Sequence, residues 1–139
     1  MDLHRVAQHP FLRELPQQEL DAVARVASER EFATGQPLMT QGDFGHCLFL
    51  VEVGTADVSV DGQIVGTVGA GDAVGEVAVM SSGRRTASVV ATSPVQAIGL
   101  FKRHVWALDR EAPEAANRLR AALGAHRGHG EEAAPLQEA

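Results

Sequence analysis

The chain contains little of what stabilises secreted proteins or anchors membrane proteins. It has one cysteine, one tryptophan and no tyrosine among 139 residues. A single cysteine excludes an internal disulfide framework and favours a reducing compartment, so we expect a cytoplasmic protein. No apolar run approaches the roughly 20 residues of a membrane span. The first residues lack the apolar stretch of a signal peptide. We therefore expect no membrane partner.

Basic residues are also in the minority. Lys and Arg number 12 against 18 Asp and Glu, which gives a formal net charge of −6. A direct nucleic-acid binder would need a basic face, so this balance argues against nucleic acid as a partner. Hydrophobic residues make up 45% of the chain. That share and this length predict one folded domain with a core of its own.

A β-rich texture dominates the middle of the chain. From residue 30 to residue 101, short apolar runs alternate with Gly, Asp and Pro. The pair Asp61-Gly62 stands between two apolar segments, which is a strong hairpin signal. About eight short strands can be counted. This pattern predicts a mainly β fold with flanking helices, an eight-stranded β-roll or jelly roll.

Helical patterns flank this region. Residues 16–27 have apolar residues at helical spacing behind Pro16, and a short helix is expected over 104–108. Pro113 suits the first turn of another helix over 114–123. We expect residues 1–127 to form the domain, with its core made by the strands. Residues 128–139 have no apolar period and are expected to be a mobile C-terminal tail.

One segment carries most of the functional information. It begins with Gly75 and Glu76 and reaches Arg85 nine positions after the glutamate. A guanidinium can donate two parallel hydrogen bonds to a phosphate. A carboxylate can only accept, so Glu76 suits a ribose hydroxyl. If the Gly75 end opens a helical turn, its free N–H groups also point at an anion.

This segment resembles the phosphate-binding cassette of the cyclic nucleotide-binding domain family. In that family an apolar residue precedes Gly-Glu-x-Ala, and Arg follows a short variable stretch. The chain departs from many members at Val74, where they carry Phe. The resemblance implies a ligand site made by these residues: Val74, Gly75, Glu76, Val77, Ala78, Arg85, Thr86, Ala87, and the strand residues Val58 and Val68.

The resemblance also implies a mechanism. The chain would sense a cyclic nucleotide, cAMP or cGMP, with cAMP favoured as the ligand, and signal by moving its C-terminal helix, with no catalysis, no metal and no cofactor. Lid contacts are expected from Arg118, Leu119 and Leu123. This chain is expected to hold no DNA-binding module, so its output would pass to an effector protein or through self-association.

Two other functions remain open from the residues alone. A ligand-independent interaction domain could keep the same roll, although Glu76 and Arg85 both persist here. A cupin metalloenzyme is also a jelly roll, but its metal site needs clustered histidines, and none of the six histidines forms a His-x-His pair on an expected strand. Cys47 lies in an apolar run, where an inert, buried thiol is expected.

Overall fold

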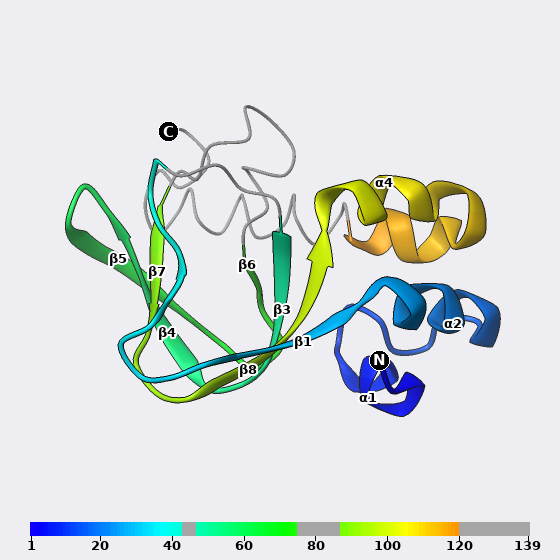
Figure 1. Ribbon diagram of the computed structural model, residues 1–139, viewed down its shortest axis with the longest axis horizontal. Helices are drawn as coiled ribbons and strands as arrows, with labels where there is room; N and C mark the ends of the chain where they lie inside the picture. The colour runs from blue at the N-terminus through cyan, green and yellow to red at the C-terminus, as the bar shows by residue number, and fades with distance from the viewer. Residues whose placement is uncertain (43–46, 75–86, 120–139) are drawn as a thin grey trace.

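Two antiparallel four-stranded sheets form the β-roll of the computed structural model, which describes residues 1–42, 47–74 and 87–119 (Figure 1). The helix-side sheet has the order β1 (Ser28–Phe32), β8 (Val95–Phe101), β3 (Cys47–Val53) and β6 (Ala73–Val74). The outer sheet has the order β2 (Pro37–Met39), β7 (Ser88–Ala91), β4 (Thr55–Val60) and β5 (Gln63–Gly69). The mainly β fold class expected from the sequence is confirmed.

The helix-side sheet is buried on both faces, and its sequence shows why. Successive side chains of a strand point to opposite faces. Leu48 and Leu50 of β3 therefore face the helices, whereas Phe49 and Val51 face the interior of the roll. A strand covered on both faces reads as a continuous apolar run, as residues 47–51 do. Cys47 lies in this run and is buried, as expected.

The hairpin between β4 and β5 turns at the two residues that the sequence indicated. Asp61 and Gly62 have positive φ angles of 52° and 83°. Two left-handed residues in a two-residue loop match the right-handed twist of the flanking strands, and Asp-Gly adopts them at little cost. The hairpin expected from the sequence is confirmed.

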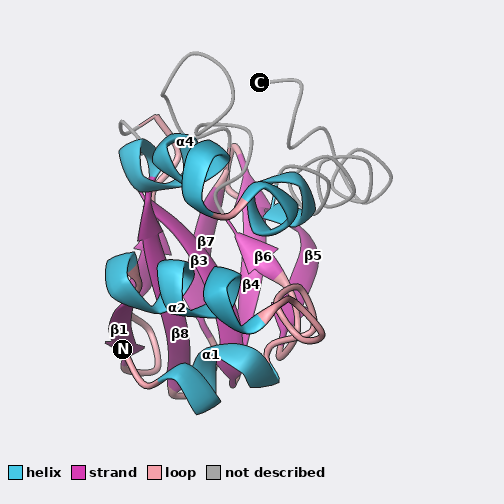
Figure 2. Ribbon diagram, turned by 90° about the vertical axis from the view of Figure 1, so that its right-hand side faces the viewer, coloured by secondary structure: helices cyan, strands magenta, loops and turns pink. Residues whose placement is uncertain are grey.

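Three helices lie side by side on the face of the helix-side sheet that points away from the outer sheet (Figure 2). They are α1 (Leu3–Gln8), α2 (Gln17–Val26) and α4 (Lys102–Glu111), and residues 113–119 are also helical. The helices expected over 16–27 and 104–108 are confirmed, the second being longer than expected. The sequence did not indicate α1.

These helices and the sheet share one core, which we call the helical cluster. Its fully buried side chains include Leu108, Leu119 and Leu12 from the helical side, and Leu48 and Leu100 from the sheet. Burying such side chains contributes about 1.5–3 kcal/mol each. The expectation that the strands alone make the core was therefore incomplete, because residues 113–119 supply part of it.

Candidate functional site

The roll encloses a second core, the inner cluster, where the expected ligand site is anchored. Val74, the last residue of β6, and Ala87, which precedes β7, are 1% and 0% exposed. Both belong to the inner cluster. The expected cassette residues between them, Gly75, Glu76, Val77, Ala78, Arg85 and Thr86, lie outside the described residues. The segment that carries the Glu and the Arg is thus held at both ends in the interior of the roll.

The two expected base-pocket residues lie in the same cluster. Val58 in β4 and Val68 in β5 are 3% and 4% exposed and face inward from the outer sheet. Val58 lies opposite Gly66 and Val89 in the sheet, and Ala56 opposite Val68. The structure therefore brings together the four expected site residues that it describes. Their contact with a ligand stays a prediction.

The expected lid residues occupy a different place. Leu119 is fully buried in the helical cluster, and Arg118 pairs with Glu114 at 3.1 Å and donates to the carbonyl of Arg13. Leu123 lies outside the described residues, as does the tail expected at 128–139. In this structure Arg118 and Leu119 serve the packing of residues 113–119 on the helical side, and their lid role stays a prediction.

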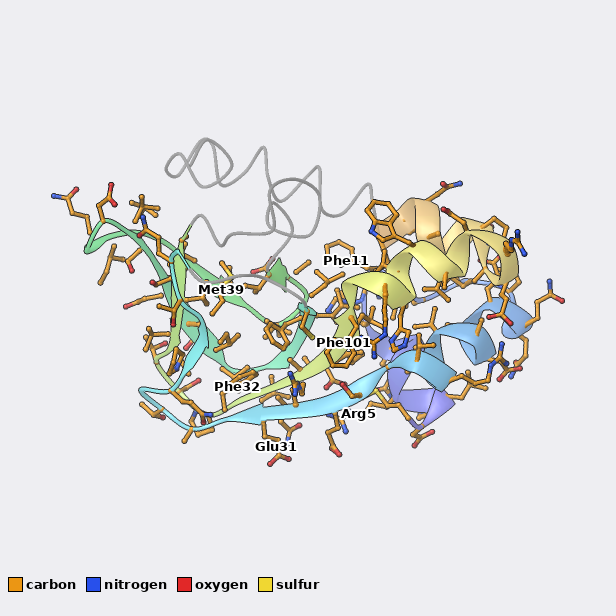
Figure 3. All side chains as sticks on the ribbon, turned by 45° about the horizontal axis from the view of Figure 1, so that its top comes forward. Arg5, Phe11, Glu31, Phe32, Met39 and Phe101 are labelled. Carbon is orange, nitrogen blue, oxygen red and sulfur yellow. The ribbon has the colours of Figure 1, made fainter. Side chains whose placement is uncertain are left out.

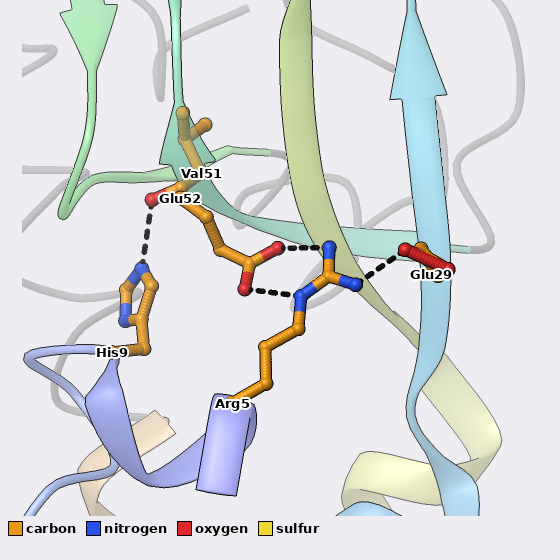
Figure 4. A network of polar contacts seen from close by, with 5 residues as sticks. All are labelled: Arg5, His9, Glu29, Val51 and Glu52. Atoms are coloured by element: carbon orange, nitrogen blue, oxygen red, sulfur yellow. Dashed lines mark hydrogen bonds and ion pairs between the residues drawn. The ribbon is translucent and has the colours of Figure 1, made fainter. Parts of the chain in front are cut away.

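Sequence reasoning missed a polar network that ties α1 to the sheet (Figure 4). Arg5 donates to both carboxylate oxygens of Glu52 in β3, at 2.8 Å from Nε and 2.7 Å from Nη2, and its Nη1 donates to Glu29 in β1. The hydrogen bonds to Glu52 and then to Glu29 raise the pKa of Arg5 above its usual value. The partners lie 24 and 47 residues away, so no local pattern could have indicated them.

Beside this network lies a buried histidine, also missed. His9 is 3% exposed, its Nε2 donates to the carbonyl of Val51 at 3.1 Å, and its Nδ1 accepts from the backbone N–H of Phe11 at 3.2 Å. Both ring nitrogens are thus used by the neutral imidazole. Burial lowers the pKa of His9, more than its hydrogen bond to Val51 raises it. Arg5, His9 and Glu52 line a cavity of about 440 Å³ against the sheet.

Within residues 1–42, 47–74 and 87–119, no group of three or more His, Cys, Asp or Glu side chains could hold a metal ion. No helix in that part of the chain is long and apolar enough to cross a membrane.

Comparison with known proteins finds a family and relatives that this sequence matches. The model of the cyclic nucleotide-binding domain family matches residues 29–111, more than half of the chain. A cAMP-dependent protein kinase regulatory subunit of Yarrowia lipolytica is 33% identical over 109 residues, which cover 78% of this chain and 27% of that protein. The cyclic AMP receptor protein of Thermus thermophilus is 31% identical over 119 residues, covering 82% and 55%.

Solved structures agree. The catabolite activator protein of Thermus thermophilus superposes with a TM-score of 0.73 at 30% identity, over 88% of this chain and 60% of that one. A cyclic nucleotide-binding protein from Geobacter metallireducens superposes with a TM-score of 0.77 at 19% identity, a likeness of fold. This chain spans about a quarter and about half of the two sequence relatives named.

An antiparallel roll with an apolar interior, joined at Val74 and Ala87 to a Gly-Glu…Arg segment, is the architecture of a nucleotide-binding β-roll domain. The chain belongs to the cyclic nucleotide-binding domain family. The family resemblance seen in the sequence is confirmed.

Proposed function

We propose that this chain binds a cyclic nucleotide inside the roll, cAMP in preference to cGMP, and reports its presence to a partner. One observation carries the proposal. The motif segment is inserted between Val74 and Ala87, both buried in the inner cluster beside Val58 and Val68. The charged motif segment is thereby joined at both ends to an apolar cluster, and a nucleotide with an anionic half and a flat apolar half would need both kinds of surroundings.

Within the segment, each polar residue has a role set by its chemistry. Arg85 would neutralise the phosphodiester through a bidentate contact. Backbone N–H groups of Gly75–Ala78 and the hydroxyl of Thr86 would complete the phosphate site. Glu76 would accept a hydrogen bond from the ribose 2′-hydroxyl, so that deoxy nucleotides bind less well. Val58 and Val68 would pack against the base.

Strand β6 is the proposed route of the signal, because its two residues belong to different clusters. Ala73 belongs to the helical cluster and Val74 to the inner cluster, and Gly75 and Glu76 come next in the chain. A ligand that pulls on the cassette would shift β6, and Ala73 would transmit that shift to the helices packed on it. A ligand can change this packing only by binding one arrangement more tightly than the other. We propose that residues 113–119, and the helix they begin, are the part that moves.

The output is proposed to be regulatory and not catalytic. The ligand would act on an effector protein or on self-association of the chain, in the cytoplasm. cAMP-dependent protein kinase regulatory subunits and a cyclic AMP receptor protein are among its relatives. Support for a purely structural, ligand-independent role would come only from failure of the ligand to bind.

The test is a titration of the full chain with cAMP and with cGMP by calorimetry and thermal denaturation. A ligand at 100 times its dissociation constant adds about 2.7 kcal/mol to the free energy of unfolding. The melting temperature should rise by roughly 2–8 °C for each kcal/mol. Arg85→Leu should weaken binding by about 2–4 kcal/mol without unfolding the domain. Arg84→Leu removes the same charge next to it and should cost much less. Absence of any shift at millimolar nucleotide would overturn the proposal.

A further inference from the structure

The helices leave one end of the helix-side sheet uncovered, and the cavity of about 440 Å³ lies there. It is bounded by α1, the end of β3, the start of β8 and the turn that joins β5 to β6. A volume of this size accommodates one long side chain or a small molecule. None of its lining residues belongs to the expected nucleotide site. We call this cavity the α1 groove, and its lining includes Arg5, His9, Pro10, Glu52, Val53 and Gln96.

The sheet contributes a row of three side chains to this surface. Val53 of β3 lies opposite Gln96 of β8, which lies opposite Glu31 of β1. A register shift between Val51 and Val53 puts Val53 in this row, whereas strict alternation would turn it into the roll. Val53 is 53% exposed, and Leu50 on the same strand is fully buried under the helices. An apolar side chain is therefore left open at this end of the sheet.

This row lies on the face of the sheet that carries the helices. Glu29, two residues before Glu31, shares its face. Glu29 lies opposite Ile98 of the helical cluster and accepts a hydrogen bond from Arg5 of α1. Glu31 points away from the roll and Phe32 points into it (Figure 3). The row thus faces away from the inner cluster, in which the motif segment is anchored.

Acidic groups dominate this surface. Glu29, Glu31 and Glu52 contribute three carboxylates and Arg5 one guanidinium, which leaves two formal negative charges. Arg5 is shared between Glu29 and Glu52 (Figure 4), and Glu31 has no ion pair within the described part of the chain. His9, which also lines the groove, adds no positive charge at neutral pH, because burial lowers its pKa. The surface therefore attracts a cation.

Apolar groups and the shape of the surface select among cations. Val53 and Pro10 are exposed and line the same cavity as Glu52. A long basic side chain can lay its aliphatic stem on such apolar groups while its charged end reaches a carboxylate. A second hollow, of about 710 Å³, is lined by Glu31 and shares Gln96 with the α1 groove. Two adjoining hollows offer more room than one small amine fills, and they fit a polypeptide segment.

We propose that the α1 groove and the row beside it bind a basic segment of a partner protein. One Lys or Arg of that segment would lie on Val53, with its cation at Glu52 or Glu31. The exposed amide of Gln96 can donate to the backbone of the segment and accept from it. A nucleic acid does not fit, because the carboxylates repel its phosphates. Binding here uses none of the residues proposed to hold the nucleotide.

The experiment uses the full chain labelled with ¹⁵N at low ionic strength. The probe is a synthetic peptide of two arginines around one leucine, blocked at both ends. Amide shifts should move in residues 5–9, 51–53, 70–71 and 96. The same peptide with citrulline in place of arginine keeps the shape without the charge, and it should bind at least about tenfold more weakly. Affinity for the arginine peptide should fall as salt is added.

Two substitutions at exposed positions test the surface without changing the core. Glu31→Gln removes one carboxylate, and Val53→Thr keeps the branched shape but loses apolar surface. Each should weaken peptide binding by about threefold, and the double variant by about tenfold. Asp21→Asn on α2 is the matched loss of one exposed carboxylate and should change the affinity by less than about twofold. The melting temperature of each variant checks that it is folded.

Four outcomes would overturn the proposal. Equal binding of the citrulline peptide would show that the charge is not recognised. Equal losses from Asp21→Asn and Glu31→Gln would show only general attraction by the net charge of −6. Free arginine amide that binds as tightly as the peptide would make the groove a small-molecule site. The same amide shifts on raising the protein concentration without peptide would make a second copy the occupant. The two single variants repeat the test if the double variant does not fold.

Discussion

Glu19 in α2 accepts a hydrogen bond of 2.7 Å from the backbone N–H of Ala115, near the start of the helical residues 113–119. Glu19 is 6% exposed, and Ala115 belongs to the helical cluster. The first N–H groups of a helix have no partner within the helix, and an acidic side chain there also suits the helix dipole. One buried carboxylate therefore caps the last described helix and fastens it to α2.

We expect Glu19→Ala to lower the free energy of unfolding by about 1–3 kcal/mol, because a buried N–H loses its partner. Glu19→Gln keeps an oxygen acceptor and should cost less. Urea denaturation followed by circular dichroism measures both. As the control, Glu114→Gln breaks only an exposed i,i+4 pair with Arg118 and should cost about 0.3–0.5 kcal/mol. Equal losses from Glu19→Ala and Glu114→Gln would show that the cap contributes nothing.

The bidentate contact of Arg5 with Glu52 predicts that Arg5 contributes more to the free energy of unfolding than an exposed arginine does. Arg5→Lys keeps the charge but cannot hold both oxygens of Glu52 and reach Glu29, so it should cost about 1–2 kcal/mol, and Arg5→Ala somewhat more. Arg25→Ala breaks the pair with Glu111, in which both side chains are more than half exposed, and should cost at most about 1 kcal/mol. Chemical denaturation of the three variants ranks their losses of unfolding free energy. Full retention of stability by Arg5→Lys would contradict the prediction.

His9 predicts a loss of stability in acid. Its folded pKa lies below the usual value of about 6.5, so the unfolded chain takes up a proton before the native protein does. The contribution is therefore complete above about pH 6.5 and is lost as the pH falls toward the folded pKa. The slope from one such group is at most about 1.4 kcal/mol per pH unit.

The measurement is the unfolding free energy of the wild type and of His9→Gln between neutral and mildly acidic pH. The Gln amide can still donate to Val51, so the variant should fold while losing this part of the pH dependence. His4→Gln, at an exposed position in α1, is the matched control, measured over the same pH range. A slope unchanged in His9→Gln would assign the acid sensitivity to other groups.

Glu76 provides a test of the proposed ribose contact. Glu76→Ala should weaken cAMP binding by about 1–3 kcal/mol, and Glu76→Gln less, because the amide oxygen still accepts a hydrogen bond. Both variants should reduce the preference for cAMP over 2′-deoxy-cAMP. Competition binding with the two nucleotides measures it. If Glu76→Ala keeps the full preference, another group recognises the hydroxyl.

The strands and their hairpin could be predicted because their signals are local. Alternating or continuous apolar runs and the Asp61-Gly62 turn depend only on neighbouring residues. The choice of Val58 and Val68 came from the family resemblance, and both are buried in the inner cluster. Helix α1 could not be found in this way, because Val6 is its only buried residue and gives no helical period. Its position depends on Arg5, whose partners come from two distant strands.

The role of the C-terminal helix was only partly predicted, for a related reason. Leu119 was expected to make lid contacts, whereas the helix that carries it is fastened by Glu19, 96 residues from Ala115. A core made by the strands alone would survive removal of residues 114–139. The structure indicates that this deletion uncovers the helical cluster, so point variants test the signal more cleanly than truncation. The ligand motif was recognisable since its chemistry lies within one short segment.

The helix-side sheet is buried on both faces, so the folded domain needs the helices that cover it. The family match starts at residue 29, after α1 and α2. A fragment cut to that match would leave Leu48, Leu50 and Leu100 open to water on one side of the sheet whose other side packs in the inner cluster. The sheet would then be an aggregation-prone surface, and the inner cluster would lose its support from the helices. The smallest chain able to keep both faces of this sheet covered therefore includes the N-terminal helices.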